Sequence, residues 1–144
     1  MLVTNLAELR KKSLPIESEE EMQKIYAELL KAYAEIKNPN KVGLAAPQIG
    51  ILKQIALIEY QDKKLVLVNP VILERDNKVL FYECCLSIPG ISVQTDRYDL
   101  ISLENGFGEM RTSKIIEGYL AIVVQHETDH LNGLTILERK HRRR

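Results

Sequence analysis

The segment His126-Glu127-Thr128-Asp129-His130 has the residue types and the spacing of a metal site on a helix. Residues four positions apart lie one turn above each other on the same helix face, so both imidazoles can bind one ion. Glu127 lies close enough to act on a water molecule bound to that ion. The chemistry that this pattern predicts is metal-assisted hydrolysis. The alternative is a surface helix whose two histidines only make hydrogen bonds.

A hydrolytic site of this kind needs a third protein ligand and one open position for water. One group of HExxH enzymes takes that ligand from a histidine six residues after the second histidine, where this chain has Ile136. Another group takes it from a glutamate on a later helix, for which the residues up to Arg144 leave no room. We therefore expect the third ligand upstream, where no histidine occurs before His126.

The chain has two cysteines, Cys84 and Cys85, and they are the upstream candidates. Adjacent cysteines cannot build a disulfide framework, which indicates a reducing compartment. A thiolate is a strong ligand for iron or zinc. In an extended segment the two side chains point to opposite faces, so only one can reach the metal, and spacing alone does not decide which. The alternative is that both are buried thiols without a chemical role.

The elements that must position these residues begin with a helix predicted from about Ser18 to Ile36. Three glutamates at positions 19–21 suit its N-terminal dipole, and Asn38-Pro39-Asn40 ends it. Apolar side chains recur along it at helical spacing, as is typical of a face packed on a core. These side chains are Met22, Ile25, Tyr26, Leu29, Leu30 and Tyr33.

Between Gln54 and Arg111, short segments rich in Val, Ile, Leu and Tyr predict antiparallel strands. Four turn signals are expected to separate them: Gln61-Asp62, Asn69-Pro70, Asp76-Asn77 and Asn105-Gly106. A final helix is predicted from Ser113 or Ile116 to Leu131, with Asn132-Gly133 at its end. The fold class is therefore α+β. We expect one domain over residues 1–144, with antiparallel strands packed around the C-terminal HExxH helix and an additional N-terminal helix.

The composition argues against nucleic-acid and membrane partners. Lysine and arginine total 20, as do aspartate and glutamate, so no global field favours DNA or anionic lipid. No apolar run reaches the ~18 residues that a membrane span needs. The first fifteen residues fit neither a secretory signal nor a transit peptide. We expect a cytoplasmic monomer.

Three segments together resemble the peptide deformylase family, which removes the formyl group from the N-terminal methionine of new bacterial and organellar proteins. They occur in the order and at the spacing of that family, and the resemblance reaches from the N-terminal helix to about Leu137. The segments are Val42-Gly43-Leu44-Ala45-Ala46-Pro47-Gln48-Ile49-Gly50, then Glu83-Cys84-Cys85-Leu86-Ser87-Ile88-Pro89-Gly90, then Gln125 to His130 followed by Leu131-Asn132-Gly133. The resemblance implies a short form without the C-terminal helix of many relatives.

The resemblance implies a role for each candidate residue. Cys85, His126 and His130 would bind one divalent metal ion, with Fe²⁺ favoured and Zn²⁺ or Ni²⁺ as substitutes. Glu127 would act as general base and then as general acid. The side-chain amide of Gln48 and the backbone N–H of Leu86 would stabilise the oxyanion.

The same resemblance identifies a peptide-binding surface. Backbone groups of the segments 42–44 and 84–86 would pair with an extended peptide, and part of the last helix would contact the methionine side chain. The residues expected to contact the peptide are Val42, Gly43, Leu44, Glu83, Cys84, Tyr119, Ile122 and Val123. Arg97 and Asp129, with Glu83, would orient the metal ligands.

Two residues depart from the family pattern, because Cys84 and Lys41 stand where the family usually has glycine. Glycine often serves close approach of the backbone, so we expect these residues to affect catalytic efficiency and substrate range more than the fold.

The predicted function is metal-dependent hydrolysis of the N-formyl group of formyl-methionyl peptides. The alternatives are a small metallopeptidase or amidase, and a non-catalytic module that binds metal or peptide. For the basic tail Arg139-Lys140-His141-Arg142-Arg143-Arg144, we expect a solvated terminus, with a contact to ribosomal RNA as the alternative.

Overall fold

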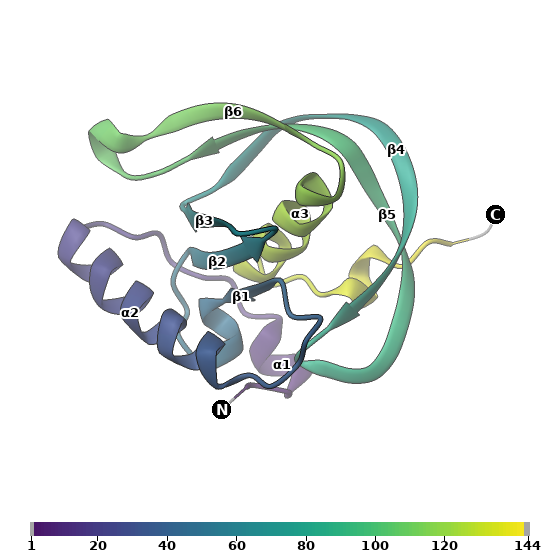
Figure 1. Cartoon of the computed structure of the whole chain (residues 1–144), viewed down its shortest axis with the longest axis horizontal. Helices are drawn as coiled ribbons and strands as arrows, with labels where there is room; N and C mark the ends of the chain where they lie inside the picture. The colour runs from purple at the N-terminus through teal and green to yellow at the C-terminus, as the bar shows by residue number, and fades with distance from the viewer. Residues whose placement is uncertain (1, 143–144) are drawn as a thin grey trace.

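The structure, a computed structural model, describes residues 2–142 and contains two three-stranded sheets and three α-helices (Figure 1). The helices are α1 (Leu6–Leu9), α2 (Glu19–Glu35) and α3 (Tyr119–Leu131), with 3-10 turns η1 (Ala46–Ile49), η2 (Gly108–Met110) and η3 (Ile136–Arg139). The strands are β1 (Gly43–Ala45), β2 (Ile55–Tyr60), β3 (Lys63–Val68), β4 (Val71–Cys85), β5 (Ile88–Asn105) and β6 (Thr112–Glu117). The predicted α+β class and single domain are confirmed.

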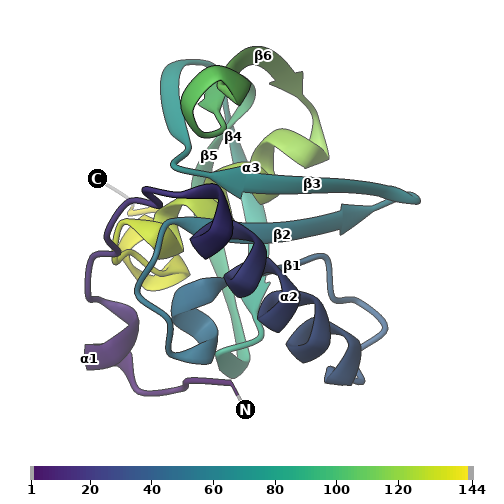
Figure 2. The same ribbon diagram turned by 90° about the vertical axis from the view of Figure 1, so that its left-hand side faces the viewer.

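All strand pairs are antiparallel, in the orders β1-β2-β3 and β4-β5-β6. The first sheet is covered on both faces, because α2 packs on one side and α3 on the other (Figures 1 and 2). Alternate residues of β2 show this directly. Ile55 and Leu57 pack in the cluster with α2, whereas Ala56 and Ile58 pack in the cluster with α3. The four buried residues of β2, 55–58, are all apolar, as expected of a strand covered on both faces.

Helix α3 lies between the two sheets and carries the HExxH residues (Figure 1). Its apolar side chains join Ile58 and Leu67 of one sheet to Ile101 and Leu103 of the other. Ten of its 13 residues are buried. Packing on both sides therefore holds the two histidines in place.

Both ends of α2 agree with the prediction from the sequence. Ser18 is the N-cap, and its side chain accepts a hydrogen bond from the Glu21 N–H. The helix ends at Glu35, before the Asn38-Pro39-Asn40 turn. The sequence was sufficient to predict the start of α2, because the capping partners Ser18 and Glu21 are only three residues apart.

The predicted start of the last helix was wrong. Residues 112–117 form β6, which pairs with β5, and the helix begins only after Gly118. Gly118 has φ +73 and donates its N–H to the carbonyl of Asp99. The segment contains the β-branched residues Thr112, Ile115 and Ile116, and its pairing with the preceding strand β5 makes it a strand.

Three of the four turn signals separate strands as predicted. The residues Gln61, Asp62 and Asn69 have positive φ in the connections between β2, β3 and β4. Asp76-Asn77 does not end a strand, because β4 continues through it and its pairing with β5 resumes at Lys78. Asn77 takes φ +58 within the strand, and its side chain donates to Asp99.

The C-terminal segment packs beside β5, where Figure 1 shows it in yellow. Lys140 forms a β-bridge with Thr95. His141 donates its N–H to the carbonyl of Gln94 at 2.7 Å, and its side chain lies 2.8 Å from Asp96. The expected solvated terminus is therefore wrong for His141 and for the backbone of Lys140, whereas the side chains of Lys140 and Arg142 are exposed. Arg143 and Arg144 lie outside the described residues.

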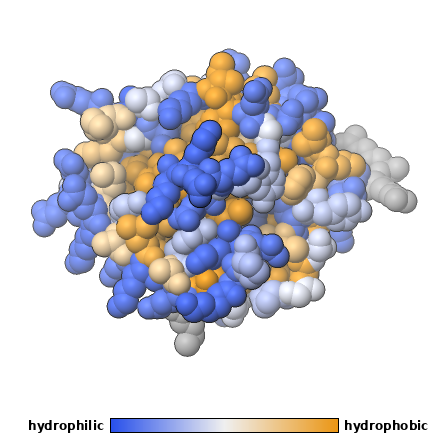
Figure 3. Space-filling model, in the orientation of Figure 1, coloured by the Kyte–Doolittle hydropathy of each residue, from blue (hydrophilic) through white to orange (hydrophobic). Residues whose placement is uncertain are grey.

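Hydrophilic and hydrophobic residues are interspersed over the face of the molecule that Figure 3 shows. Within residues 2–142, no helix combines the length and the apolar character that crossing a membrane would require.

We expect Gly133→Ala to destabilise the fold more than an ordinary glycine replacement. Gly133 follows α3 with φ +77, and a β-carbon there would lie 2.6 Å from the Arg10 carbonyl oxygen. The left-handed backbone and this clash together should lower the free energy of unfolding by about 3 kcal/mol, measured by urea denaturation.

Gly50→Ala is the matched control for this substitution. Gly50 has φ +82 but open space around it, so only the backbone strain, about 1–2 kcal/mol, should appear. Equal losses for the two variants would show that the contact with Arg10 contributes nothing.

Candidate active site and metal centre

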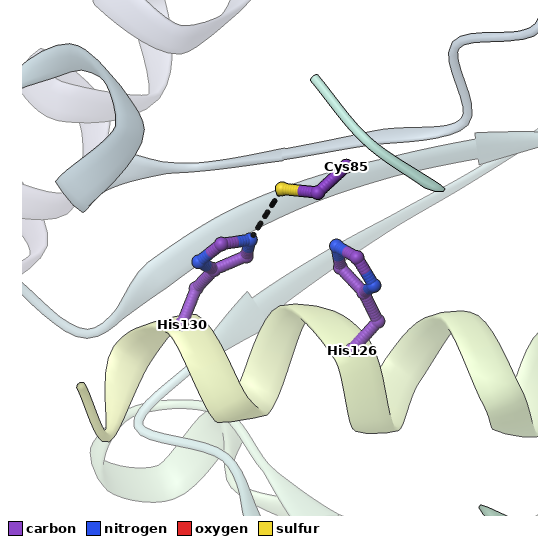
Figure 4. Close-up of side chains that lie close together, drawn as sticks. All are labelled: Cys85, His126 and His130. Carbon is purple, nitrogen blue, oxygen red and sulfur yellow. Dashed lines mark hydrogen bonds between the residues drawn. The ribbon is translucent and has the colours of Figure 1, made fainter. Parts of the chain in front are cut away.

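Three potential metal ligands converge at the end of β4 and on α3. Cys85 is the last residue of β4, and His126 and His130 stand one turn apart on the helix. Their ligand atoms all lie within 4.8 Å of one another. The Cys85 Sγ is 3.3 Å from the His130 Nε2, and both imidazole rings lie beside the thiol (Figure 4).

The cysteine pair behaves as an extended segment predicts. Cys84 is exposed and Cys85 is buried, so the two side chains lie on opposite faces of β4. Their Cα partners on β5 are Ser92 and Ile88, with an irregularity in the register between them. Only Cys85 therefore faces the histidines of α3.

The environment of these residues fits a divalent metal ion. One thiolate and two imidazoles are the donor set that zinc and ferrous iron prefer. Burial and the nearby charge of His126 hold the pKa of His130 well below its usual range, which favours the neutral imidazole that binds metals. The Nδ1 of His130 is buried without a hydrogen-bond partner. His126 has its Nδ1 bonded to Glu83, so its Nε2 is the atom available as a ligand.

The carboxylate of Glu83 holds His126 in this orientation. Its Oε1 lies 2.8 Å from His126 Nδ1 and accepts a hydrogen bond from Nη2 of Arg97. Its Oε2 accepts hydrogen bonds from the Thr95 hydroxyl and from Nε of Arg97. Burial alone would raise the pKa of Glu83, but the hydrogen bonds from His126 and Arg97 outweigh it and lower the pKa to about 2. Glu83 is therefore an anion matched to the imidazole N–H.

The network of charged side chains extends beyond Glu83 through buried and half-buried residues. Arg97, which is 2 % exposed, donates from Nη1 to Asp129 at 2.6 Å. Asp129 also accepts two hydrogen bonds from Arg139 of η3, at 2.9 and 3.0 Å. Two carboxylates thus face two guanidinium groups, so the network from Glu83 to Arg139 is balanced in charge. It connects β4, β5, α3 and η3 in one network.

Glu127 lies at the centre of the site with little contact to other polar groups. Its carboxylate is buried, and Oε1 has no hydrogen-bond partner. Burial raises the pKa of Glu127 to about 7, against the opposing charge of His126. A β-carbon on Gly43 would lie 2.6 Å from Glu127 Oε2, so glycine is needed there to admit the carboxylate. An unpartnered acid with this pKa suits proton transfer near neutral pH.

The side chain of Gln48 is fixed by hydrogen bonds at both ends. Its Oε1 accepts the Ala45 N–H at 2.9 Å, which settles the orientation of the amide. Its Nε2 donates to the Ser87 hydroxyl at 3.1 Å and lies 3.9 Å from Cys85 Sγ. The NH₂ group therefore points toward the metal ligands. Leu86 follows Cys85 in the turn between β4 and β5.

A cavity of about 680 Å³ opens next to these residues. One wall is formed by β1 and the loop before it, and another by the end of β4 and the turn that follows. Helix α3 forms the third wall. Strands β1 and β4 are edge strands of their sheets, so each has one edge without a neighbouring strand. On α3 the lining residues are Tyr119, Ile122, Val123, His126 and Glu127. A cavity lined by residues of two edge strands suits an extended peptide.

The structure separates the predicted peptide-contacting residues into two groups. Val42, Gly43, Cys84, Tyr119, Ile122 and Val123 line the cavity. Leu44 does not, because its fully buried side chain packs in the cluster with α2. Glu83 is part of the wall, yet its carboxylate is occupied by His126, Thr95 and Arg97. The side chains of Leu44 and Glu83 are therefore engaged elsewhere, whereas the backbone contact expected of segment 42–44 stays a prediction.

Three residues of the site were missed from the sequence. Ser87 holds Gln48, Thr95 binds Glu83, and Arg139 binds Asp129. Thr95 could have been found, because it lies two residues before Arg97 and alternate residues of a strand share a face. Ser87 and Arg139 carry no such local signal.

Comparison with known proteins agrees with this geometry. A sequence model of the family described as Polypeptide deformylase matches residues 1–144. The peptide deformylase of Dictyoglomus thermophilum is 46% identical over 101 residues, which cover 69% of this chain and 66% of that protein.

Solved structures resemble the whole chain. A crystal structure of peptide deformylase from Thermotoga maritima has a TM-score of 0.88 and 32% identity, and the match covers 99% of this chain and 97% of that one. A Met-Ala-Ser-bound class I type b peptide deformylase from Acinetobacter baumannii has a TM-score of 0.83 and 27% identity, with 96% of each chain covered.

We expect Arg97→Met to weaken both the fold and metal binding. It removes a buried cation between Glu83 and Asp129, so the free energy of unfolding should fall by about 3–5 kcal/mol. Because Glu83 would lose part of its support for His126, metal affinity should fall about 10–100-fold. Urea denaturation and competition with a chelator measure the two effects.

Arg75→Met is the control, since Arg75 is an exposed residue of β4. If Arg97→Met does not fold, Glu83→Gln tests the same support with a smaller structural change. Metal affinity equal to that of the unmodified chain in both site variants would show that the network does not orient His126.

Proposed function

The chain belongs to the polypeptide deformylase family, and from this premise we propose that it hydrolyses the formyl group of formyl-methionyl peptides, releasing formate. The observation that carries this proposal is the convergence of Cys85, His126 and His130 at a cavity that also holds the Glu127 carboxylate. The free edges of β1 and β4 along that cavity support an extended peptide as the substrate.

Membership of the family implies a divalent metal ion, and Cys85, His126 and His130 would hold it. We propose Fe²⁺ as the physiological ion, as the family resemblance implies. Zn²⁺ or Ni²⁺ could substitute for it, because both also accept thiolate and imidazole ligands. Such an ion, when bound, supplies Lewis-acid catalysis and lowers the pKa of water to ~7.

Glu127 would transfer the protons of the reaction. In the proposed role it takes a proton from the attacking water as the oxygen–carbon bond forms. It then delivers that proton to the amine as the carbon–nitrogen bond breaks, which leaves formate and a free N-terminus. The burial of its carboxylate and its pKa of about 7 support both directions of transfer.

Gln48 and Leu86 would stabilise the oxyanion that develops on the formyl oxygen. Hydrogen bonds to Ala45 and Ser87 already direct the Gln48 NH₂ toward the site, so little reorganisation is needed. The backbone N–H of Leu86 would be the second donor. Loss of one such donor typically costs on the order of 3 kcal/mol of transition-state stabilisation.

The peptide would be recognised mainly through its backbone and its first side chain. We infer that its backbone pairs with Val42 and Gly43 on one side and with Cys84 on the other. The methionine side chain would lie against Tyr119, Ile122 and Val123 of α3. Action in the cytoplasm, a monomeric state and contact of the basic tail with ribosomal RNA stay predictions.

Formate release from formyl-Met peptides, assayed anaerobically with Fe²⁺, Ni²⁺ or Zn²⁺, tests the proposed function. We expect formate with at least one ion and the highest rate with Fe²⁺. Internal cleavage of unformylated peptides would favour a metallopeptidase instead. Metal uptake without any turnover would favour a binding module, and either result would overturn the proposal.

Glu127→Gln should abolish most turnover while leaving metal content unchanged. The substitution preserves size but removes the proton-transfer group, so kcat should fall at least about 10²–10⁴-fold. Elemental analysis measures the bound metal, and formate release measures kcat. Glu117→Gln, which changes an exposed glutamate at the end of β6, is the matched control. Activity retained in Glu127→Gln would disprove its assigned role.

A further inference from the structure

Lys41 makes a double connection to Tyr33 at the end of α2. Its ammonium donates to the Tyr33 carbonyl at 2.6 Å and lies 4.3 Å from the centre of the Tyr33 ring. In return, the Tyr33 hydroxyl donates to the Lys41 carbonyl at 3.2 Å. Carbonyls in the last turn of a helix carry partial negative charge, which favours a cation there.

The surrounding loop completes the attachment of Lys41. Its N–H donates to the Asn38 carbonyl at 3.2 Å, and the Asn40 N–H donates to the Asn38 side chain at 2.9 Å. All polar groups of Lys41 are therefore bonded within residues 33–41. Tyr33 is a firm partner because its side chain is buried in the cluster between α2 and the first sheet. Burial raises the pKa of Tyr33 to about 12, so its hydroxyl keeps the proton that it donates.

The connection between Lys41 and Tyr33 lies immediately before the cavity edge of β1. The carbonyl of Val42 accepts the Glu59 N–H of β2 at 2.8 Å, and Gly43 meets the Glu127 carboxylate. Two extended residues span only about 7 Å. Lys41 itself lines the cavity. A shift of Lys41 would therefore move the β1 edge relative to Glu127 and to anything bound in the cavity.

Resting on the proposed function, we propose that Lys41 is a positioning residue that holds the β1 edge, through Tyr33, in the place where it pairs with the backbone of a formyl peptide. Lys41 does not offer its charge to the peptide, because the ammonium is already directed to the Tyr33 carbonyl and ring. Pairing along β1 is equally strong in the bound substrate and in the transition state. It therefore contributes to KM and not to kcat.

Lys41→Met tests this role, since the variant keeps an apolar chain over the Tyr33 ring but loses the ammonium. We expect KM for formyl-Met-Ala-Ser to rise about fivefold, equivalent to ~1 kcal/mol, while kcat stays within about twofold. For formyl-Met alone the increase should be smaller, because that substrate has no further backbone to pair with β1. Lys41→Arg should restore most of the affinity, and Lys31→Met, at an exposed position of α2, should change nothing.

Hydrogen–deuterium exchange of residues 38–45 tests the connection without turnover. Exchange should be faster in Lys41→Met and in Tyr33→Phe, and the double variant should show less than the sum of the two effects. Binding of the product peptide Met-Ala-Ser should weaken in parallel with the rise in KM. These readouts remain informative even if the unmodified chain releases no formate, a result that would overturn the proposed function alone.

Three outcomes would overturn the positioning role. The first is unchanged exchange in Lys41→Met, which would mean that the connection to Tyr33 does not hold the loop. The second is faster exchange with unchanged KM and unchanged product binding. The third is a rise in KM confined to peptides with acidic residues, which would indicate a direct charge contact between Lys41 and the peptide.

Discussion

The site depends on the buried ion pair between Glu83 and Arg97. An isolated buried charge is strongly unfavourable, so each of these groups needs a partner with good geometry. Glu83 is hydrogen-bonded to His126 and Thr95 in addition to Arg97, and Arg97 donates a further hydrogen bond to Asp129. Because these residues come from β4, β5 and α3, satisfying the charges also places the HExxH helix against the second sheet. The same contacts that satisfy buried charge therefore orient the imidazole of His126, a proposed metal ligand.

The cavity is lined by residues of β1 and β4, each an edge strand of its sheet, and by residues of α3. The β1 edge approaches closely enough that only glycine fits beside the Glu127 carboxylate. The β4 edge ends in Cys85 and the turn with Leu86. Residues of both edges, the side chains of Cys85 and His126 and the Glu127 carboxylate thus line one cavity. In the proposed function, this arrangement would let the fold bind a peptide through its backbone and act on the terminal group.

The two departures from the family pattern have different structural consequences. Cys84 places an exposed thiol on the cavity wall, across β4 from Cys85, and its neighbours keep the pairing with β5. The ammonium of Lys41 donates a hydrogen bond to the Tyr33 carbonyl of α2, and the Tyr33 hydroxyl donates to the Lys41 carbonyl. These contacts connect the loop before β1 to α2. Neither residue disturbs an element of the fold, as the sequence suggested. Both residues line the cavity, and Lys41 has the additional proposed role of holding the β1 edge.

The sequence by itself determined the features that depend on short-range spacing. The i, i+4 histidines, the capped ends of α2 and the opposite faces of Cys84 and Cys85 all follow from helix and strand geometry. Tertiary structure alone decided that residues 112–117 pair as β6, that β4 continues through Asn77, and that Leu44 faces α2. It also selected Ser87, Arg139 and Tyr33 as partners. These outcomes depend on contacts between different elements of the fold or on which face of an element becomes buried, and the spacing of residues within one element carries no information about either.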